Sequence, residues 1–348
     1  MPPTTTMKRI AGELGVSITT VSKVLNNRDD IGHATRARVL AKVAELGYQP
    51  NAVARSLTLR RTHTLGVVIP DLMHSFFVEI IAGIETIASA RGYGILLCSS
   101  SEDPAKERQE LDMLRQRQVD GIVLGSASAA GNTDLLQQLA SLGVGLVMID
   151  RDDHPDVACD RVVTDDEEVG RLATAHLLAQ GRRAIAHITG TAVVHARRRA
   201  AGYRAALRQA GIKVQPAWIV RGGFKEADGY AGMQKLLALS KSSRVDAVFA
   251  ANDPSAIGAM KAIWDAGLRV PEDIAVAGAG DIALGDMLRV PLTTVSWSRE
   301  DQGKAAAELL LERIEGDPRA PSPPKRVVIP PRLVVRRSSR RHDGTKGT

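Results

Sequence analysis

Residues Thr6–Asn26 read TMKRIAGELGVSITTVSKVLN, a pattern that predicts two short helices joined by a tight turn. Thr6 and Ser17 are suited to cap the two helices, and Gly15 provides the break between them. The apolar residues recur at helical spacing, as Met7, Ile10, Ala11 and Leu14 and then as Val21, Val24 and Leu25. Two such helices are typical of a helix-turn-helix unit that reads DNA, and an ordinary helical hairpin is the alternative.

The second helix has an outer face whose chemistry suits the major groove of DNA. That face is mostly short and polar, contains no acid, and consists of Ile18, Thr19, Ser22, Lys23 and Asn26. A lysine donates well to guanine O6 and N7. We therefore predict that Ile18, Thr19 and Lys23 read bases.

The sequence after this unit carries further motifs. A third amphipathic helix is predicted over about Ala34 to Leu46, where Gly47 ends it. The motifs are VSxTTVSxVLN at residues 16–26, LGYxPN at residues 46–51 and ARSL at residues 54–57. In their order and spacing they resemble the LacI/GalR family of bacterial repressors, and the resemblance extends from residue 6 to about residue 338. It implies a DNA-binding headpiece, a short hinge helix and a sensor core.

The resemblance also implies roles for single residues at the DNA. Thr20, Ser22 and Asn26 stand at positions that contact phosphates, and Leu57 stands where the family inserts a leucine into the minor groove. His33, Asn51 and Arg55 complete the set of residues that we assign to DNA contact. The expected partner is a palindromic double-stranded operator, bound by a homodimer.

Charge and composition fit a molecule that places one end on phosphates. Residues 1–63 hold ten basic and four acidic residues, whereas the body of the chain is mildly acidic. No apolar run is long enough to span a membrane, and the first residues lack the apolar core of a signal peptide, so we expect a cytoplasmic protein. Two cysteines exclude a disulfide framework, and the histidines lack the spacing of metal ligands.

From Thr64 onward, short apolar runs alternate with amphipathic stretches, which predicts an α/β core of parallel sheets flanked by helices. The expected strands are 65–69, 94–98, 121–124, 145–149, 184–188, 247–250 and 274–277. The expected helices are 75–90, 104–117, 133–141, 165–180, 195–209, 227–239, 254–266 and 299–314. By resemblance, the core is similar to periplasmic sugar-binding proteins, whose two lobes are joined by three crossover strands and close on a small effector.

These observations divide the chain into four parts. We expect an all-α helix-turn-helix headpiece at residues 1–50, a hinge helix and linker at residues 51–63, a two-lobed core at residues 64–338 and a disordered tail at residues 339–348. The arginines near the end of the chain flank a last strand, and we interpret the residues after it as solvated.

Ligands of parallel α/β sheets bind beyond the carboxyl ends of the strands. Polar residues and two phenylalanines follow the predicted strands, a mixture that suits the hydroxyls and CH faces of a sugar. For Asp150–Asp153 a solvated loop is an alternative interpretation, and for Asn252 and Asp253 a helix cap before Pro254 is the alternative. The resemblance implies effector contacts at Phe76, Phe77, His195, Arg199, Asn252, Asp253 and Asp281. Ala279, Gly280 and Trp297 depart from the pattern of the family.

Other functions are disfavoured by the sequence. Gly278–Ala283 fits a loose dinucleotide-binding pattern, but the strand predicted at Pro291–Val295 leaves little room for the helix that must receive a pyrophosphate. The hydrolase motifs are missing, and a transport receptor would not need the headpiece. We therefore expect no enzyme, cofactor or metal, but a repressor of a carbohydrate-utilisation operon that is switched by a sugar or sugar acid.

Overall fold

A computed structural model describes residues 6–25, 28–48, 61–127, 131–151, 153–240, 244–317 and 322–340. The chain forms two compact units, a headpiece at residues 1–62 and a core at residues 63–348. Within the described residues, no helix combines the length and the apolar character that crossing a membrane requires.

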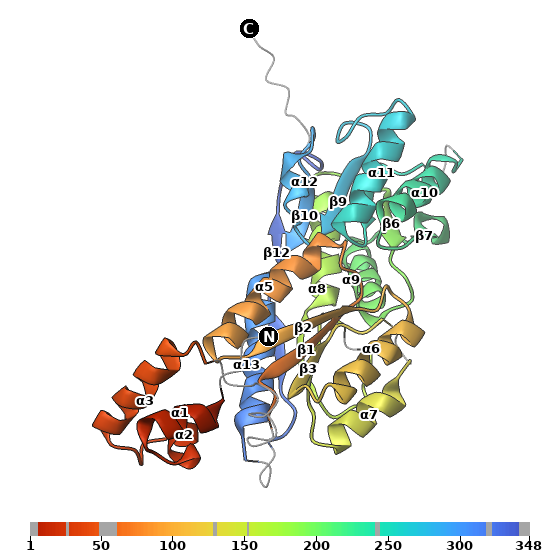
Figure 1. Ribbon diagram of the computed structural model, residues 1–348. Coiled ribbons are helices and arrows are strands. Elements are labelled where there is room, and N and C mark those ends of the chain that lie inside the picture. Colours follow the sequence, from red (N-terminus) through yellow and green to blue (C-terminus); the bar gives the residue numbers. More distant parts are fainter. Residues whose placement is uncertain are drawn as a thin grey trace. The chain divides into compact units, whose positions relative to one another are not determined.

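The headpiece is helical, as the sequence predicts, with α1 at Met7–Leu14, α2 at Ile18–Leu25 and α3 at His33–Glu45 (Figure 1). The Thr6 side chain accepts a hydrogen bond from the Arg9 N–H over 3.3 Å, and Ser17 Oγ accepts one from the Thr20 N–H over 3.0 Å. Gly15 ends α1 with a φ of 65°. Both predicted caps and the predicted break are thus confirmed. The three helices bury Ile10, Ala11, Val21, Val24 and Val39 against one another.

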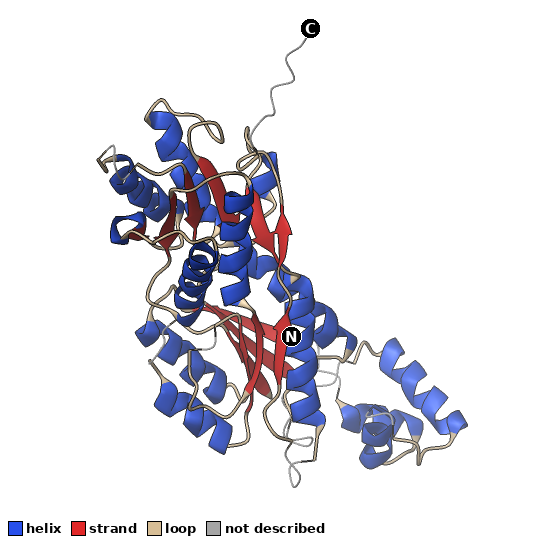
Figure 2. Cartoon of the chain, turned by 180° about the vertical axis from the view of Figure 1, so that it is seen from behind, coloured by secondary structure: helices blue, strands red, loops and turns tan. Residues whose placement is uncertain are grey.

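The core contains two sheets of six strands each, which divide it into two lobes. Sheet A has the order β11-β5-β4-β3-β1-β2, and all of its strands are parallel. Its strands are β1 Thr64–Ile69, β2 Gly94–Ser99, β3 Gly121–Leu124, β4 Gly145–Ile149, β5 Asp160–Thr164 and β11 Arg326–Ile329. One face is covered by α5 Ser75–Ala90 and α13 Arg299–Glu315, and the other by α6 Pro104–Gln116 and α7 Thr133–Ser141 (Figure 2).

Sheet B has the order β12-β10-β9-β8-β6-β7, and only β12 runs antiparallel to its neighbour. Its strands are β6 Ile185–Thr189, β7 Ile219–Arg221, β8 Ala247–Ala250, β9 Ala275–Ala279, β10 Thr293–Ser296 and β12 Arg332–Val334. Helices α8 Asp166–Ala179 and α9 Val194–Gln209 cover one face, and α10 Glu226–Leu237 and α11 Asp253–Asp265 the other. The short elements are the 3-10 helix Pro216–Trp218 and α12 Leu284–Met287.

Three chain segments connect the lobes: β5 leads into α8, β10 leads into α13, and β11 leads into β12. The two-lobed α/β architecture expected from the sequence is therefore confirmed. One apolar core runs through both lobes, from Leu65 and Val147 in sheet A to Ile185 and Phe249 in sheet B. Since burial of apolar surface is the main stabilising contribution, this shared core stabilises the two lobes as one unit.

Close helix contacts fix the parts of lobe B that matter for the site. A Cβ added to Gly170 of α8 would lie 2.0 Å from the Arg199 carbonyl oxygen of α9. A Cβ added to Gly202 of α9 would lie 1.9 Å from the Glu167 carbonyl oxygen of α8. Neither position has room for a side chain, and the close approach of α8 and α9 brings Asp166 and Arg199 together.

The sequence pattern missed β5, β7 and β11, whose apolar runs are short. It also placed Ser339 in the tail, whereas the structure buries this side chain completely. Ser339 Oγ lies 2.7 Å from His176 Nε2 and 2.6 Å from Thr293 Oγ1, and Ser338 Oγ donates to the Val276 carbonyl over 2.7 Å. The chain thus remains packed on sheet B beyond β12 because these hydroxyls satisfy buried polar groups.

Candidate functional site

The surface of the headpiece presents the side chains that we expect at DNA. Ile18, Thr19, Lys23 and His33 are exposed, and Thr20 and Ser22 are partly exposed. Lys23 Nζ pairs with the Asp30 carboxylate, and both side chains are about half exposed, at 47% and 56%. The remaining assigned positions, Asn26, Asn51, Arg55 and Leu57, lie outside the described residues.

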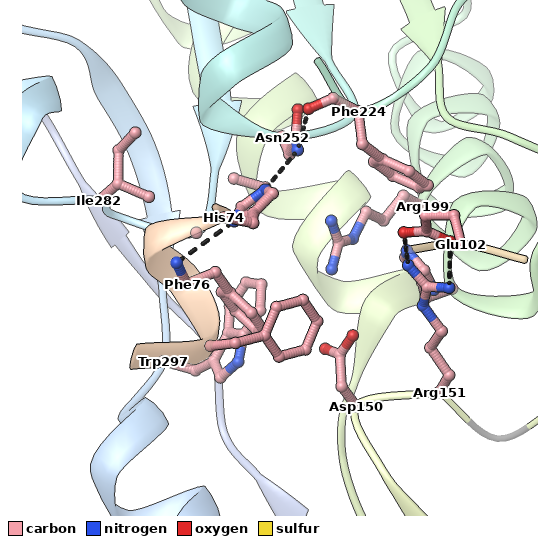
Figure 3. A pocket seen from close by; sticks show the side chains of 14 residues that line it. His74, Phe76, Glu102, Asp150, Arg151, Arg199, Phe224, Asn252, Ile282 and Trp297 are labelled. Atoms are coloured by element: carbon pink, nitrogen blue, oxygen red, sulfur yellow. Dashed lines mark hydrogen bonds and ion pairs between the residues drawn. The ribbon is translucent and has the colours of Figure 1, made fainter. Parts of the chain in front are cut away.

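A cavity of about 470 Å³, which includes some open solvent, lies between the lobes of the core. Its walls are the carboxyl ends of strands from both sheets together with the first turns of α5 and α9, as the rule for parallel sheets requires. The lining residues are His74, Phe76, Phe77, Glu102, Asp150, Arg151, His195, Arg199, Phe224, Asn252, Ala279, Gly280, Ile282 and Trp297 (Figure 3).

Aromatic rings form part of the wall. The Phe76 ring meets the Phe77 ring edge-on with centroids 5.1 Å apart, and it meets the Trp297 ring at 5.6 Å. From lobe B, His195 stacks on Phe224 with centroids 5.0 Å apart. The cavity thus offers flat apolar surfaces from both lobes, against which the CH faces of a small ring can pack.

Arg199 is a cation of the site that the protein holds by several contacts. Its Nε donates to Asp166 Oδ1 over 2.9 Å, and its Nη1 donates to the Ala251 carbonyl over 2.8 Å. Its guanidinium carbon lies 5.3 Å from the centre of the Trp297 ring, which allows a cation–π contact. Burial raises the pKa of Asp166 to about 6, and the charge of Arg199 opposes this rise. Arg199 Nη2 makes no hydrogen bond to the described residues and remains available to a ligand.

A second guanidinium lines lobe A. Arg151 is 3% exposed, and its Nη1 and Nη2 donate to the two oxygens of Glu102 over 2.8 and 2.7 Å. Nη1 also donates to the Ser126 carbonyl over 2.8 Å. This bidentate pair fixes both side chains at the edge of the cavity.

Asp150 lies near both arginines, but its side chain has no hydrogen-bond or ion-pair partner among the described residues. It follows β4 directly, its backbone has a φ of 65°, and only 7% of the residue is exposed. Neither carboxylate oxygen has a hydrogen-bond or ion-pair partner among the described residues. Burial raises the pKa of Asp150, and the charges of Arg151 and Arg199 lower it. Figure 3 shows the carboxylate pointing into the cavity.

Asn252 connects the two lobes and also caps a helix. Its Oδ1 accepts from the Ser255 N–H over 3.0 Å, and its Nδ2 donates to the Phe224 carbonyl over 2.8 Å. The same Nδ2 lies 3.2 Å from Nε2 of His74, which stands before α5 in lobe A. Both interpretations of Asn252 from the sequence therefore describe real features: it begins α11, and it lines the cavity.

Two residues that the sequence analysis assigned to the effector lie outside the cavity lining. Asp253 is fully buried, and its oxygens accept from Thr294 Oγ1 over 2.6 Å and from the Ile282 N–H over 2.9 Å. Asp281 Oδ1 accepts from Arg336 Nη2 over 2.8 Å. The other five assigned side chains, Phe76, Phe77, His195, Arg199 and Asn252, meet at the cavity.

Several lining residues were not assigned from the sequence. Phe224 follows β7, a three-residue strand that the pattern did not reveal. Asp150 and Arg151 were noted as residues after a strand, but a solvated loop remained an alternative for them; the structure buries both. His74 stands among the residues 71–77 that the rule for parallel sheets selects after the first strand, although no effector contact was assigned to it; Glu102 lies one residue beyond the range 99–101 that the rule selects after β2.

The structure also bears on the alternative chemistries. The Gly278–Ala283 segment leads into α12, which has only four residues, so it provides no long helix for a pyrophosphate. Among the described residues, no three His, Cys, Asp or Glu side chains gather in a way that could hold a metal ion.

Comparison with known proteins gives the chain a family. A model of "Bacterial regulatory proteins, lacI family" matches residues 6–51, and a model of "Periplasmic binding protein-like domain" matches residues 174–339.

Two similar proteins of known sequence extend over most of the chain. The HTH-type transcriptional repressor PurR of Aliivibrio fischeri (strain MJ11) is 38% identical over 89% of this chain and 92% of its own length. The ribose operon repressor of Escherichia coli (strain K12) is 37% identical over 89% of this chain and 93% of its own.

A solved structure is similar over nearly the whole length. The Lac repressor dimer bound to operator and the anti-inducer ONPF is 27% identical over 97% of this chain and 99% of that chain, with a TM-score of 0.83. The expected resemblance is confirmed: the chain belongs to the lacI family of bacterial regulatory proteins.

Proposed function

We propose that this protein is a sequence-specific DNA-binding transcriptional repressor whose operator affinity is set by a small carbohydrate bound between the lobes of its core. The observation that carries the proposal is the cavity itself. It combines aromatic rings with hydrogen-bonding side chains from both lobes, and it belongs to the same chain as a helix-turn-helix headpiece.

The chemistry of the cavity supports a carbohydrate as the effector. Asp150 offers two acceptor oxygens and Arg199 offers a donor, while Phe76 and Trp297 present flat apolar surfaces. Such a set matches a ring that carries hydroxyls on its edge and CH groups on its faces. A ligand that contacts both lobes binds more tightly to one arrangement of the lobes than to the other. Only such a difference in affinity can shift the equilibrium between the two arrangements.

The headpiece supports operator DNA as the partner. Ile18, Thr19 and Lys23 share the exposed side of α2, and we propose that they read bases in the major groove. The related ribose repressor and the Lac repressor dimer bound to operator have names that agree with this function. Binding to DNA would place the protein in the cytoplasm.

We propose a homodimer as the active form. Val78 of α5 and Leu97 of the edge strand β2 are apolar and are 58% and 42% exposed, and α5 contacts β2. Exposed apolar side chains on neighbouring elements favour a second copy as their cover. Sedimentation of the wild type and of Val78→Glu tests this, because the variant should shift the protein toward the monomer.

The experiment for the function uses the full chain. Selection from random duplexes should enrich an inverted repeat, and operator affinity should then change at least tenfold with one member of a panel of pentoses, hexoses and disaccharides. A lack of sequence preference would contradict the DNA-binding role. A response to purine bases but to no carbohydrate would contradict the effector assignment. We propose that the protein has no catalytic activity. A sugar incubated with the protein should therefore remain chemically unchanged.

A further inference from the structure

The cations that line the cavity are already neutralised by the protein. Both terminal nitrogens of Arg151 donate to the Glu102 carboxylate, with 2.7 Å between Nη2 and Oε1. Arg199 pairs with Asp166, and the two side chains are only 5% and 3% exposed. A carboxylate thus already offsets the charge of each guanidinium, so Arg199 Nη2 can donate a hydrogen bond to a ligand without supplying an unbalanced positive charge.

The histidines add no positive charge to the lining. Burial lowers the pKa of His195 well below its usual value, and it also lowers the pKa of His74. Both imidazoles are therefore neutral near pH 7. They can exchange hydrogen bonds with hydroxyl groups, but they do not attract an anion.

Two carboxylates remain without a cation of their own. Asp150 points into the cavity with both oxygens unpartnered among the described residues. Asp153 lies close behind it and is 2% exposed; its Oδ1 accepts from the Val194 N–H over 2.9 Å, and its Oδ2 is buried without a partner in the described part of the chain. The two arginines of the lining, Arg151 and Arg199, therefore stand against four carboxylates, two of them paired (Glu102 and Asp166) and two without an ion pair among the described residues (Asp150 and Asp153).

We propose that the cavity selects an uncharged polyhydroxyl ligand, a neutral sugar or sugar alcohol, and rejects sugar acids and sugar phosphates. The inference rests on the proposed carbohydrate effector and narrows its chemical class. Two neighbouring hydroxyls can each donate to one oxygen of Asp150, which satisfies a buried acceptor that has no other donor. A carboxylate or phosphate brings no such donor and adds a like charge in a region of low dielectric.

Titration calorimetry on the full chain tests the inference with ligands matched in carbon skeleton. The pairs are ribose with ribonate and ribose 5-phosphate, glucose with gluconate and glucose 6-phosphate, and galactose with galactonate and galactose 6-phosphate. For the skeleton that binds, the neutral member should have a Kd at least tenfold below that of either anion.

Asp150→Asn provides the decisive variant, because asparagine keeps the size of the side chain and tolerates the positive φ. This variant should bind the neutral ligand more weakly and the anions more tightly than the wild type does. The ratio of the anion Kd to the neutral Kd should therefore fall at least fivefold. Glu308→Gln, which removes an exposed acid from α13, is the matched control and should leave the ratio within twofold.

The outcomes separate this inference from the proposed function. An anion that binds the wild type more tightly than its neutral parent overturns the charge preference and leaves the carbohydrate effector in place. A ratio that does not respond to Asp150→Asn also overturns it. If no ligand binds in this calorimetry and no pentose, hexose or disaccharide changes operator affinity, the carbohydrate effector itself is contradicted, and the charge preference with it.

Discussion

Arg199 of α9 and Asp166 of α8 form an ion pair that is almost completely buried, with 2.9 Å between Nε and Oδ1. The close approach of the two helices at Gly170 and Gly202 sets this distance. The pair has two roles: it satisfies a buried carboxylate, and it holds Arg199 Nη2 at the cavity. Stability and ligand binding are therefore coupled at this residue.

Arg199→Ala is expected to destabilise the core as well as to abolish the effector response. Removal of one partner of a buried pair leaves the other charge uncompensated, which costs about 3–5 kcal/mol. Arg199→Met combined with Asp166→Asn removes both charges and should recover most of this loss, while the effector response stays absent. Thermal unfolding and calorimetry measure the two effects. Equal unfolding midpoints for the single and the double variant would show that the pair is energetically unimportant.

Asp253 is expected to act on stability and not on ligand affinity, because its oxygens face Thr294 and the Ile282 N–H. Asp253→Ala leaves the buried Ile282 N–H without an acceptor and should cost about 1–3 kcal/mol. In Asp253→Asn the amide oxygen can accept from that N–H and the amide nitrogen can donate to Thr294 Oγ1, so this variant should retain most of the stability. Both should bind the effector with wild-type affinity when folded. A loss of affinity in Asp253→Asn would instead place Asp253 at the ligand.

The contrast between Asp253 and Asp150 shows how far sequence reasoning reaches. Periodicity located most strands and helices to within two residues, and the rule for parallel sheets located the loops that form the site. Neither rule specifies the direction of a side chain. Asp150 and Asp253 both follow strands, yet one faces the cavity and the other turns back toward β10.

Phe224 and Ser339 show a second limit. Phe224 depends on β7, which has three residues and no periodicity to detect. Ser339 belongs to a polar, arginine-rich end that resembles a solvated tail, and only its contacts with His176 and Thr293 reveal that it is buried. Such long-range hydrogen bonds leave no local pattern in the sequence.

His187 is expected to make the core less stable in acid. Its ring stacks on Phe249 with centroids 4.8 Å apart, Nδ1 donates to the Phe249 carbonyl over 2.9 Å, and burial lowers its pKa from 6.5 to about 4. Between pH 6.5 and pH 4 the unfolded chain binds a proton that the folded chain does not, so the contribution of His187 to stability falls as the pH falls. The full difference is about 3 kcal/mol.

His187→Phe removes this titration and keeps the stacked ring. The difference in unfolding free energy between the wild type and the variant should be constant above pH 7 and should shift in favour of the variant between pH 6.5 and pH 4. Subtraction of the two curves cancels the other ionisable groups. Parallel curves over the whole range would contradict the role of His187.

Lys23 is expected to read a base, although in the isolated chain its ammonium pairs with Asp30. This pair is exposed and therefore weak, so guanine O6 and N7 can replace the carboxylate at little cost. Lys23→Ala should weaken binding to the selected operator by about ten- to a hundredfold and binding to random duplex only slightly.

Asp30→Asn removes the competing carboxylate and should tighten binding to both duplexes. Lys8→Ala, which removes an exposed lysine from α1, is the charge-matched control and should affect both duplexes alike. Fluorescence anisotropy at several salt concentrations measures these affinities, and equal losses of Lys23→Ala on both duplexes would make Lys23 a phosphate contact instead.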